Sequence, residues 1–399
     1  KVGQNYDGLK KLNFSNSFKD PTFMREKLFF DLCREQGVPA PRANYANVKY
    51  NGEDWGFYTL IEQIDDQFLD WRIGNDSGNL FKAGSNFSGG DGEANLVYLG
   101  LDQSLYESSY ELKSNEETND WYDLIDFIYF LNSSSDAEFE LGLPSRLDLG
   151  PFLSSVAFNN LFSNLDTYTL SARNYYLYHN MSTDLWEWIK WDANETFGSY
   201  AFGVQTPMTN LPIDFFQGQR PLLERVFESD LFMNQYTSEI CLLLNTVFNP
   251  EYLNPIINNY KELIQQYVYA DNNKMFSNND FDTNINSNLG GPGGTIYGLK
   301  SFIQARYNYL SSAVNCNAFA SLPSFISQDF SVHPNPSNGL LNIHGVDSYP
   351  IDYKVYSIEG KCVLSGQLHS NEHILDMSML QPEMYLLKIG NKPLKVIKQ

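Results

Sequence analysis

Three residues in the middle of the chain have the types and spacing needed to handle a phosphoryl group. Asp166 lies in the loop SNLDTYTLSAR after a helical stretch, Asn174 begins the β-rich run that follows, and Asp192 ends the next run, in WDANETFG. Transfer of a phosphoryl group needs oxygen ligands for Mg²⁺ and a carboxylate within hydrogen-bonding reach of the attacking hydroxyl. The two Asp and the Asn could supply these groups if the fold brings them together.

The order of these residues along the chain is typical of a protein kinase. A helix, a loop with Asp, an Asn, a hairpin and a second Asp followed by Phe-Gly is the order of the kinase base and its metal ligands. Asp166 is therefore the candidate base, and Asn174 and Asp192 are the candidate metal ligands. Two structural alternatives stay open, because Asp166 could close a turn and Asp192 could cap a helix with Glu195 as its capping-box partner.

The elements that must position these residues predict an α+β domain. Helical periodicity marks residues 21–36, 65–73, 118–131, 148–165, 221–244, 250–270 and 301–313. The β-rich runs are residues 9–14, 44–50, 55–62, 174–179 and 185–191. Asp20 is expected to cap the first helix and Gly37 to end it, and an Asn-Gly turn joins the second and third β-rich runs. The polar residues 84–95 and 271–294 predict loops.

Length and charge exclude some classes of protein. The chain has 399 residues and a formal net charge of −21, with 27 Lys and Arg against 48 Asp and Glu. This length suggests two domains, or one large domain with a small appendage. A strongly negative chain repels phosphate backbones, so we expect no nucleic-acid partner. No run approaches the roughly 18 apolar residues of a membrane-spanning helix, so we expect no membrane-spanning segment.

The four cysteines are widely spaced. Cys33, Cys241, Cys316 and Cys362 form no C-x-x-C pair, which argues against a zinc site. The favoured interpretation is that they are small buried hydrophobic residues. The alternative is one disulfide, between Cys241 and Cys316, which would require an oxidising compartment.

Composition changes between residues 322 and 329. Residues 330–399 hold six of the 27 basic and six of the 48 acidic residues, so the whole excess of negative charge lies upstream. This tail alternates apolar and polar residues between Pro, Gly and Asn, a pattern typical of a β-sandwich. We predict a first domain at residues 1–318, a linker at residues 319–329, and a small all-β, immunoglobulin-like sandwich at residues 330–399.

Eight segments of the first domain resemble the CotH kinase family. In chain order they are GLKKLNFSNSFKDPTFMREKLFFDLCREQGVPAPRANY, VKYNGEDWGFYTLIEQID, GNLFKAG, YELKSNEE, NLDTYTLSARNYYLY, WIKWDANETFG, RPLLERVF and YGLKSFIQAR. Members of this family are similar to atypical secreted protein kinases. The resemblance therefore implies an atypical protein-kinase-like fold and transfer of phosphate from ATP, with Mg²⁺, to protein Ser or Thr residues. In this chain Asp166 would orient or deprotonate the hydroxyl, and Asp192 with Asn174 would hold the metal.

The resemblance also implies nucleotide contacts. Glu62 would lie beside the adenine of ATP, and either Lys11 or Lys82 would contact phosphate; the spacing does not choose between them. The family has further strands upstream of Leu9, so the domain is expected to be truncated at its amino end.

The tail has a resemblance of its own. FSVHPNPSNGLLNIHG, YKVYSIEGKCVLSG, ILDMSMLQPEMYLLKI and the terminal KVIKQ resemble the type A sorting domain of the type IX secretion system of Bacteroidota. This implies that residues 330–399 engage the type IX secretion machinery. The protein would then be exported across the outer membrane and released or attached to the cell surface.

Two functional hypotheses follow. The leading one is an exported CotH-like protein kinase whose acidic surface favours basic, Ser-rich protein substrates. The alternative is a non-catalytic cell-surface adhesin or matrix protein that keeps the kinase-like fold, which the 26 Tyr, 28 Phe and 6 Trp residues would suit as a binding surface.

Overall fold

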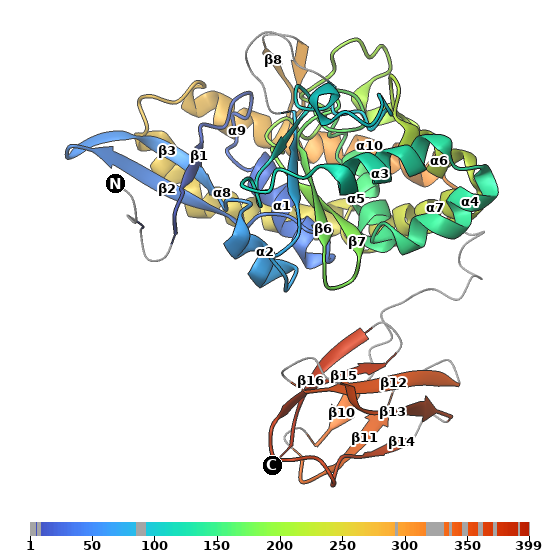
Figure 1. The fold of residues 1–399 in the computed structure, drawn as a ribbon. Coiled ribbons are helices and arrows are strands. Elements are labelled where there is room, and N and C mark those ends of the chain that lie inside the picture. The colour runs from blue at the N-terminus through green and yellow to red at the C-terminus, as the bar shows by residue number, and fades with distance from the viewer. Residues whose placement is uncertain are drawn as a thin grey trace. The chain divides into compact units, whose positions relative to one another are not determined.

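The computed structural model describes residue 5 and residues 9–84, 93–291, 294–316, 331–334, 337–344, 350–357, 362–369, 373–389 and 392–398. The chain divides into two compact units, Lys1–Cys316 and Asn317–Gln399 (Figure 1). Each unit has its own buried apolar core. The predicted linker, residues 319–329, lies outside the described residues.

The first unit mixes helices with small antiparallel sheets. Its helices are α1 (Arg25–Glu35), α2 (Asp66–Arg72), α3 (Tyr122–Ser133), α4 (Asp136–Gly142), α5 (Leu149–Leu161), α6 (Pro221–Glu228), α7 (Asp230–Thr246), α8 (Pro250–Ala270), α9 (Asn278–Asn286) and α10 (Leu299–Ala313). Three short 3₁₀ helices are η1 (Gln103–Leu105), η2 (Leu143–Ser145) and η3 (Met208–Asn210). The α+β composition predicted from the sequence is therefore present in this unit.

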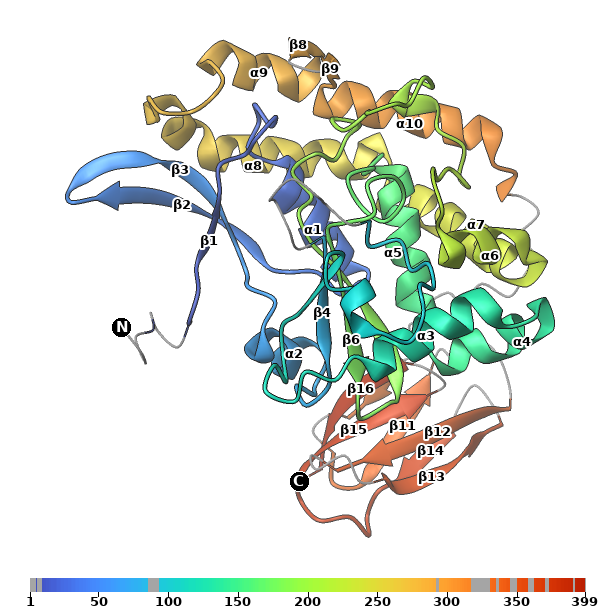
Figure 2. The same ribbon diagram turned by 45° about the horizontal axis from the view of Figure 1, so that its top comes forward.

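Two sheets frame the region in which the candidate residues lie. One has the order β1-β3-β2, built from β1 (Asn13–Ser15), β2 (Ala43–Tyr50) and β3 (Glu53–Ile61). The other has the order β5-β4-β6-β7, built from β4 (Leu80–Ala83), β5 (Tyr110–Leu112), β6 (Tyr175–Asn180) and β7 (Leu185–Lys190). Figure 2 shows the first sheet projecting at one side of the unit, with α1 between it and α5. A third, two-stranded sheet joins β8 (Leu289–Gly291) and β9 (Gly294–Ile296).

The predicted hairpin between residues 44 and 62 is confirmed. β2 and β3 pair antiparallel, with Tyr50 opposite Glu53 across a two-residue turn. Asn51 and Gly52 both have positive φ values, 52° and 87°. Such a turn matches the twist of the two strands, and Asn-Gly adopts it with little strain.

The first helix begins later than predicted. It starts at Arg25 rather than at residue 21, because Phe23 has a φ of 59°, which is incompatible with a right-handed helix. Asp20 stabilises the turn that leads into this helix. Its carboxylate accepts hydrogen bonds from the backbone N–H groups of Thr22 and Arg25, both at 2.9 Å. The strand predicted at residues 9–14 is also shorter, since only Asn13–Ser15 pairs with β3.

Two other predictions are corrected by local capping. Residues 221–244 form two helices because Ser229, extended, ends α6 and accepts a hydrogen bond from the Phe232 N–H to cap α7. The loop predicted at residues 271–294 contains α9. Ser277 and Asp280 form a reciprocal capping box, and Phe281 on α9 is fully buried, so this segment has both a start signal and a core-facing side. Of the other predicted loop, residues 85–92 lie outside the described residues.

The interpretation of the cysteines as small, buried, free residues holds for Cys33 only. Cys241 of α7 and Cys316 form a disulfide across 75 residues of chain. Cys33 is buried and free, as expected for a small hydrophobic residue, whereas Cys362 is exposed. The disulfide ties the carboxyl end of the first unit to α7.

The second unit is all-β. One sheet has the order β10-β11-β14, from β10 (Ser331–His333), β11 (Leu340–His344) and β14 (His373–Asp376). The other has the order β13-β12-β15-β16, from β12 (Ile351–Tyr356), β13 (Cys362–Leu368), β15 (Met384–Ile389) and β16 (Lys392–Ile397). Leu341 and Leu375 from the first sheet join Val355 and Leu387 from the second in one buried cluster. The prediction of a small all-β domain is thus confirmed, while its immunoglobulin-like character stays a prediction.

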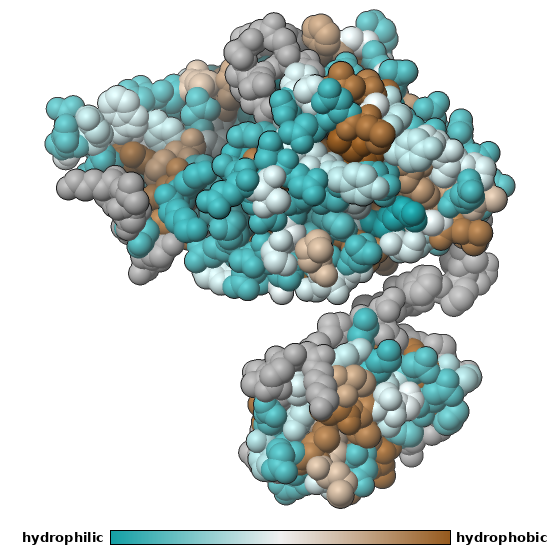
Figure 3. All heavy atoms as spheres, in the orientation of Figure 1, coloured by the Kyte–Doolittle hydropathy of each residue, from teal (hydrophilic) through white to brown (hydrophobic). Residues whose placement is uncertain are grey.

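The surface carries both polar and apolar side chains. Figure 3 shows a largely hydrophilic face on the first unit, with apolar patches near its edges. Among the residues that the structure describes, no helix combines the length and apolarity needed to cross a bilayer.

The disulfide should contribute measurably to stability. We expect replacement of Cys241 and Cys316 by Ala to lower the free energy of unfolding by about 2–4 kcal/mol, because the cross-link restricts the unfolded chain. Denaturant unfolding of the wild type with and without dithiothreitol would measure the same difference. The double variant serves as the control, since reductant should leave its midpoint unchanged. Equal midpoints for all four samples would contradict the expectation.

Candidate active site

The β6-β7 hairpin places two of the candidate residues at one end. The strands pair antiparallel over their full length, so Asn174, which precedes β6, and Asp192, which follows β7, lie at the same end of the hairpin. On the other side of β6, the register sets Lys82 of β4 opposite Tyr176. Three segments that are distant in the sequence therefore converge here.

Asp166 is held against Asn174. The Asn174 side-chain N–H donates to the Asp166 carbonyl oxygen at 2.9 Å and to Asp166 Oδ2 at 3.1 Å. Asn174 has a φ of 60° and Ala172 a φ of 52°, which turns the loop back on itself. Arg173 Nε lies 4.0 Å from Asp166 Oδ1. The loop thus brings the Asn to the Asp across eight positions, and Asp166 both closes a turn and faces the site.

Asp192 is a half-buried carboxyl close to other acidic side chains. Burial, and then the neighbouring Asp166, raises its pKa to about 6, while Lys82 and Arg173 act in the opposite direction. Its φ is 51°, an unfavourable conformation of the kind that clusters at functional sites. The residues after it form turns and no helix, so the interpretation of Asp192 and Glu195 as a helix capping box is wrong.

A further carboxyl, from α1, completes this group. Glu26 is buried, and its Oε1 accepts a 3.4 Å hydrogen bond from the N–H of Ala193, the residue after Asp192. Its Oε2 is buried with no hydrogen-bond partner. Burial, and then Asp192, raises the pKa of Glu26 to about 8, while Ser15 of β1 acts in the opposite direction. The sequence pattern shows Glu26 only as a polar residue in the first turn of a helix, so it was not among the predicted site residues.

Glu195 lies at the edge of the same group. Lys19 Nζ donates to Glu195 Oε2 at 3.0 Å and also lies 5.9 Å from the Tyr200 ring centroid. Burial raises the pKa of Glu195, the Lys19 ammonium opposes this, and Asp166 and Asp192 add to the rise. Glu26, Asp166, Asp192 and Glu195 therefore form a group of neighbouring acidic side chains, called the carboxyl cluster below.

A buried arginine holds the loop that carries Asp166. Arg220 Nε donates to the Tyr168 carbonyl at 2.5 Å and another of its N–H groups donates to the Leu170 carbonyl. The Arg220 side chain is 1% exposed. The Gln217 N–H adds a 3.0 Å bond to the Thr169 carbonyl. The loop conformation is thus fixed from outside by the segment that leads into α6.

The two candidate phosphate-contacting lysines lie in different places. Lys82 is close enough to Asp192 to lower its pKa. Lys11 instead lines a pocket of about 520 Å³, together with Glu62. The Glu62 carboxylate accepts from Arg42, at 2.8 Å from Nε, and lies 3.6 Å from Arg72. The structure therefore groups Lys82 with Asp166, Asn174 and Asp192, and groups Lys11 with Glu62.

The oxygen atoms of this cluster are of a type that could hold Mg²⁺. Among the described residues no three His, Cys, Asp or Glu side chains are placed as a ready metal cluster. The unpartnered Glu26 Oε2 and Asp166 Oδ1 are buried oxygens of the type that Mg²⁺ prefers. Since Mg²⁺ commonly uses one or two carboxylates plus water and phosphate oxygens, Asp192 and Asn174 could hold it in that way.

Comparison with known proteins assigns both units. The family described as CotH kinase protein matches residues 1–310. The chain belongs to this family. The family described as Secretion system C-terminal sorting domain matches residues 331–399. Among curated proteins, the inner spore coat protein H of Bacillus subtilis (strain 168) is 29% identical over 281 residues, which cover 69% of this chain and 74% of that protein.

These matches confirm the resemblance of both domains. The sorting domain marks this CotH family member for export by the type IX secretion system, to the cell surface or the medium. The Cys241–Cys316 disulfide agrees with that destination, because disulfides persist in oxidising compartments.

Glu26 should make stability fall as pH rises. Its folded-state pKa of about 8 lies above the ordinary Glu value, so the unfolded chain releases this proton first and the fold loses stability between about pH 4.5 and pH 8. We expect Glu26→Gln to stabilise the Mg²⁺-free protein at pH 8 by on the order of 1 kcal/mol or more, and by less at pH 5. Urea unfolding at both pH values measures this; Glu262→Gln, at an exposed position of α8, is the control. A Glu26→Gln effect independent of pH would refute the assignment.

Arg220 should govern the mobility of the Asp166 loop. We expect Arg220→Met to speed amide hydrogen exchange across residues 166–173 by about tenfold or more, because two loop carbonyls lose their donors. Arg225→Met is the matched control, since Arg225 on α6 instead bonds the Leu131 carbonyl and Ser134. That control should leave exchange in the Asp166 loop unchanged. Hydrogen exchange in the Arg220 variant as slow as in the wild type would contradict this role of Arg220.

Proposed function

We propose that this protein is an exported kinase that transfers the γ-phosphate of ATP to Ser or Thr hydroxyls of extracellular or surface proteins. The observation that carries the proposal is the convergence of Asp166, Asn174 and Asp192 at one end of the β6-β7 hairpin, beside Lys82. The family described as CotH kinase protein supports this reaction class. The proposal includes an atypical kinase-like fold for the first unit.

Each residue has a role in the proposed reaction. Asp166 orients the substrate hydroxyl and accepts its proton as the hydroxyl oxygen attacks the γ-phosphorus and ADP leaves. Asn174 fixes the Asp166 carboxylate by its 3.1 Å hydrogen bond. Asp192, with the Asn174 side-chain oxygen, would hold Mg²⁺, which supplies charge neutralisation on the phosphates when bound. Lys82 would contact a phosphate oxygen.

The proposed place for the nucleoside is the pocket lined by Lys11 and Glu62. The segment from Leu12 to Ser15 connects this pocket to the carboxyl cluster: Leu12 lines the pocket, and Ser15 of β1 is close enough to Glu26 to lower its pKa. Three residues of extended chain span about 10 Å, a separation that a nucleoside triphosphate can bridge. Because Arg42 and Arg72 already engage the Glu62 carboxylate, adenine recognition there would rely on neighbouring backbone groups.

A basic, Ser-rich protein is the proposed substrate class. The chain carries 48 acidic against 27 basic residues, with the excess upstream of residue 330. Such a field attracts cationic segments and slows approach of anionic ones. Raising the salt concentration should therefore weaken substrate binding, because exposed charges are screened.

The second candidate is a non-catalytic adhesin on the same fold. Tyr50 and Trp55, at the tip of the β2-β3 hairpin, are 64% and 55% exposed, with ring centroids 5.7 Å apart. Exposed aromatic pairs of this kind suit a binding surface. This hypothesis requires no ATP binding, so one experiment separates the two.

Phosphoryl transfer from labelled ATP to a Ser-rich, Lys-rich peptide tests the proposal. We expect Mg²⁺-dependent labelling of the peptide, and a loss of about 100-fold or more in kcat for Asp166→Asn and for Asp192→Asn. Asp192→Asn should also weaken Mg²⁺-dependent ATP binding, measured by calorimetry, whereas Asp166→Asn should leave it largely intact because Asp166 acts on the hydroxyl.

The controls keep the catalytic group untouched. Asp54→Asn, at an exposed ion pair with Lys49 on the β2-β3 hairpin, should retain full activity. Labelling that persists in both Asp variants, or folded wild-type protein that binds no ATP with Mg²⁺, would reject the kinase and favour the adhesin.

A further inference from the structure

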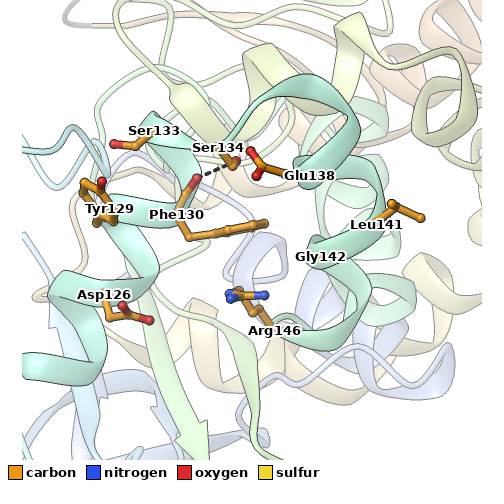
Figure 4. A pocket seen from close by; sticks show the side chains of 9 residues that line it. All are labelled: Asp126, Tyr129, Phe130, Ser133, Ser134, Glu138, Leu141, Gly142 and Arg146. Atoms are coloured by element: carbon orange, nitrogen blue, oxygen red, sulfur yellow. Dashed lines mark hydrogen bonds between the residues drawn. The ribbon is translucent and has the colours of Figure 1, made fainter.

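A second pocket, of about 590 Å³, lies between α3 and α4 and includes none of the candidate active-site residues. The Phe130 ring of α3 extends toward α4 and lies beside Arg146, just after η2, while Leu141 of α4 lies at the outer edge of the pocket (Figure 4). Leu141 is 84% exposed, and Tyr129 beside Phe130 is 49% exposed. The pocket thus combines a cation with apolar and aromatic surface that is open to a ligand.

Arg146 differs from the other arginines in having no polar partner. The chain has nine arginines. Eight of them form at least one hydrogen bond or ion pair. The Arg146 guanidinium forms neither with any residue that the structure describes. Its five N–H donors are therefore available to a ligand, on a side chain that is half-buried between the two helices.

The guanidinium is nevertheless held in place. It stacks on the Phe130 ring, with 4.2 Å between the guanidinium carbon and the ring centroid. The Trp186 N–H fixes the backbone of Arg146 by a 2.7 Å bond to its carbonyl. Gly142 leaves the room required: a Cβ there would lie 3.0 Å from the Phe130 ring and 3.3 Å from Arg146 Nη1. Stacking on a ring pre-organises the guanidinium fork for a planar anion.

The walls of the pocket are also fixed. A capping box between Ser135 and Glu138 starts α4. Arg225 donates to the Leu131 carbonyl at 3.1 Å and to Ser134 Oγ at 2.8 Å, which secures the turn between α3 and α4. Binding would therefore cost little ordering of the protein.

The surrounding charges select a singly charged ligand. The Glu138 carboxylate accepts hydrogen bonds from the Ser135 N–H and hydroxyl, both at 2.8 Å, and forms no ion pair with Arg146. Asp126 lies exposed on the rim of the pocket. Because these two acids make the charged lining net negative, an anion binds only by direct contact with the guanidinium, and a phosphate dianion is repelled more strongly than a carboxylate.

We propose that this pocket binds a monocarboxylate carried by an apolar group. The carboxylate accepts two parallel N–H bonds from Arg146, and the apolar group packs on Tyr129 and Leu141. A peptide with a free carboxyl terminus after an aromatic residue and a small aromatic acid both present this chemistry.

Calorimetric titration of the full chain with four probes tests the proposal. The probes are N-acetyl-Leu-Phe as the free acid, the same dipeptide as its amide, 3-phenylpropionate, and phenyl phosphate. We expect the dipeptide acid to bind at least about tenfold more tightly than its amide, because the amide removes one acceptor and the charge. A dipeptide acid that also exceeds 3-phenylpropionate identifies a peptide terminus as the ligand, and the reverse order identifies a small acid.

Two variants assign binding to the pocket. Arg146→Lys keeps the charge but loses the fork and the stack, and we expect about tenfold weaker binding. Gly142→Ala keeps the guanidinium and favours the helix, but its methyl group would displace Phe130, so it should weaken binding in a protein that remains folded. Lys49→Met, on the β2-β3 hairpin, is the control and should bind as the wild type does. Circular dichroism melting checks that all variants are folded.

Four results would overturn the proposal. They are equal affinity for the dipeptide acid and amide, tighter binding of phenyl phosphate than of 3-phenylpropionate, no saturable binding up to about 10 mM, and affinities unchanged by both Arg146→Lys and Gly142→Ala.

Discussion

Repulsion between poorly solvated carboxyl groups is the constraint on which the candidate site depends. Asp192 and Glu26 lie close together in a unit that carries all but one of the 21 excess negative charges of the chain. Burial, and then Asp166, raises the pKa of Asp192 to about 6, whereas burial, and then Asp192, raises that of Glu26 to about 8. Among the described groups, Lys82 and Arg173 lower the pKa of Asp192. An arrangement of this kind costs folding free energy and persists only where the surrounding structure fixes it. A divalent cation, as the proposed function requires, would offset this excess of negative charge.

Buried arginines hold the loops around the candidate site in place, and they bond backbone carbonyls more often than carboxylates. Arg25, beside Glu26 on α1, donates to the Thr196 carbonyl at 3.1 Å and lies 5.4 Å from the Phe197 ring centroid, which ties the start of α1 to the loop after Asp192. Arg220 holds the Asp166 loop in the same manner. Arg306 of α10 bonds the carbonyls at residues 209 and 211 and the side chain at residue 160. Most of the N–H groups of these guanidinium groups bond structural partners, and only the Nε atoms of Arg25 and Arg306 have no hydrogen-bond partner among the described residues. These arginines therefore stabilise the loops and do not offset the charge of the carboxyl cluster.

The part of the site that could be predicted is the part that depends on residues close together in the sequence. The β6-β7 hairpin, and with it the placement of Asn174 and Asp192 at one end, follows from two aromatic β-rich runs and a short turn. The contribution of Glu26 was not predictable, because it depends on the angle at which α1 packs, and Phe23 shifts the start of that helix by an unusual φ of 59°. The choice between Lys11 and Lys82 was likewise open in the sequence. It depends on the pairing of β4 with β6 across about 90 residues, a register that no local pattern records.

α1 contributes residues to both parts of the proposed nucleotide site, the carboxyl cluster and the pocket that contains Lys11 and Glu62. Glu26 faces Asp192, whereas Lys27 and Asp31, one and five positions later, line the pocket that contains Lys11 and Glu62. Lys27 and Asp31 are joined by a 2.7 Å ion pair, so this part of the helix surface is rigid. A displacement of α1 therefore changes both the distances within the carboxyl cluster and the shape of the pocket. Residues that set the position of α1, Arg25 above all, affect the carboxyl cluster and the pocket without belonging to either of them.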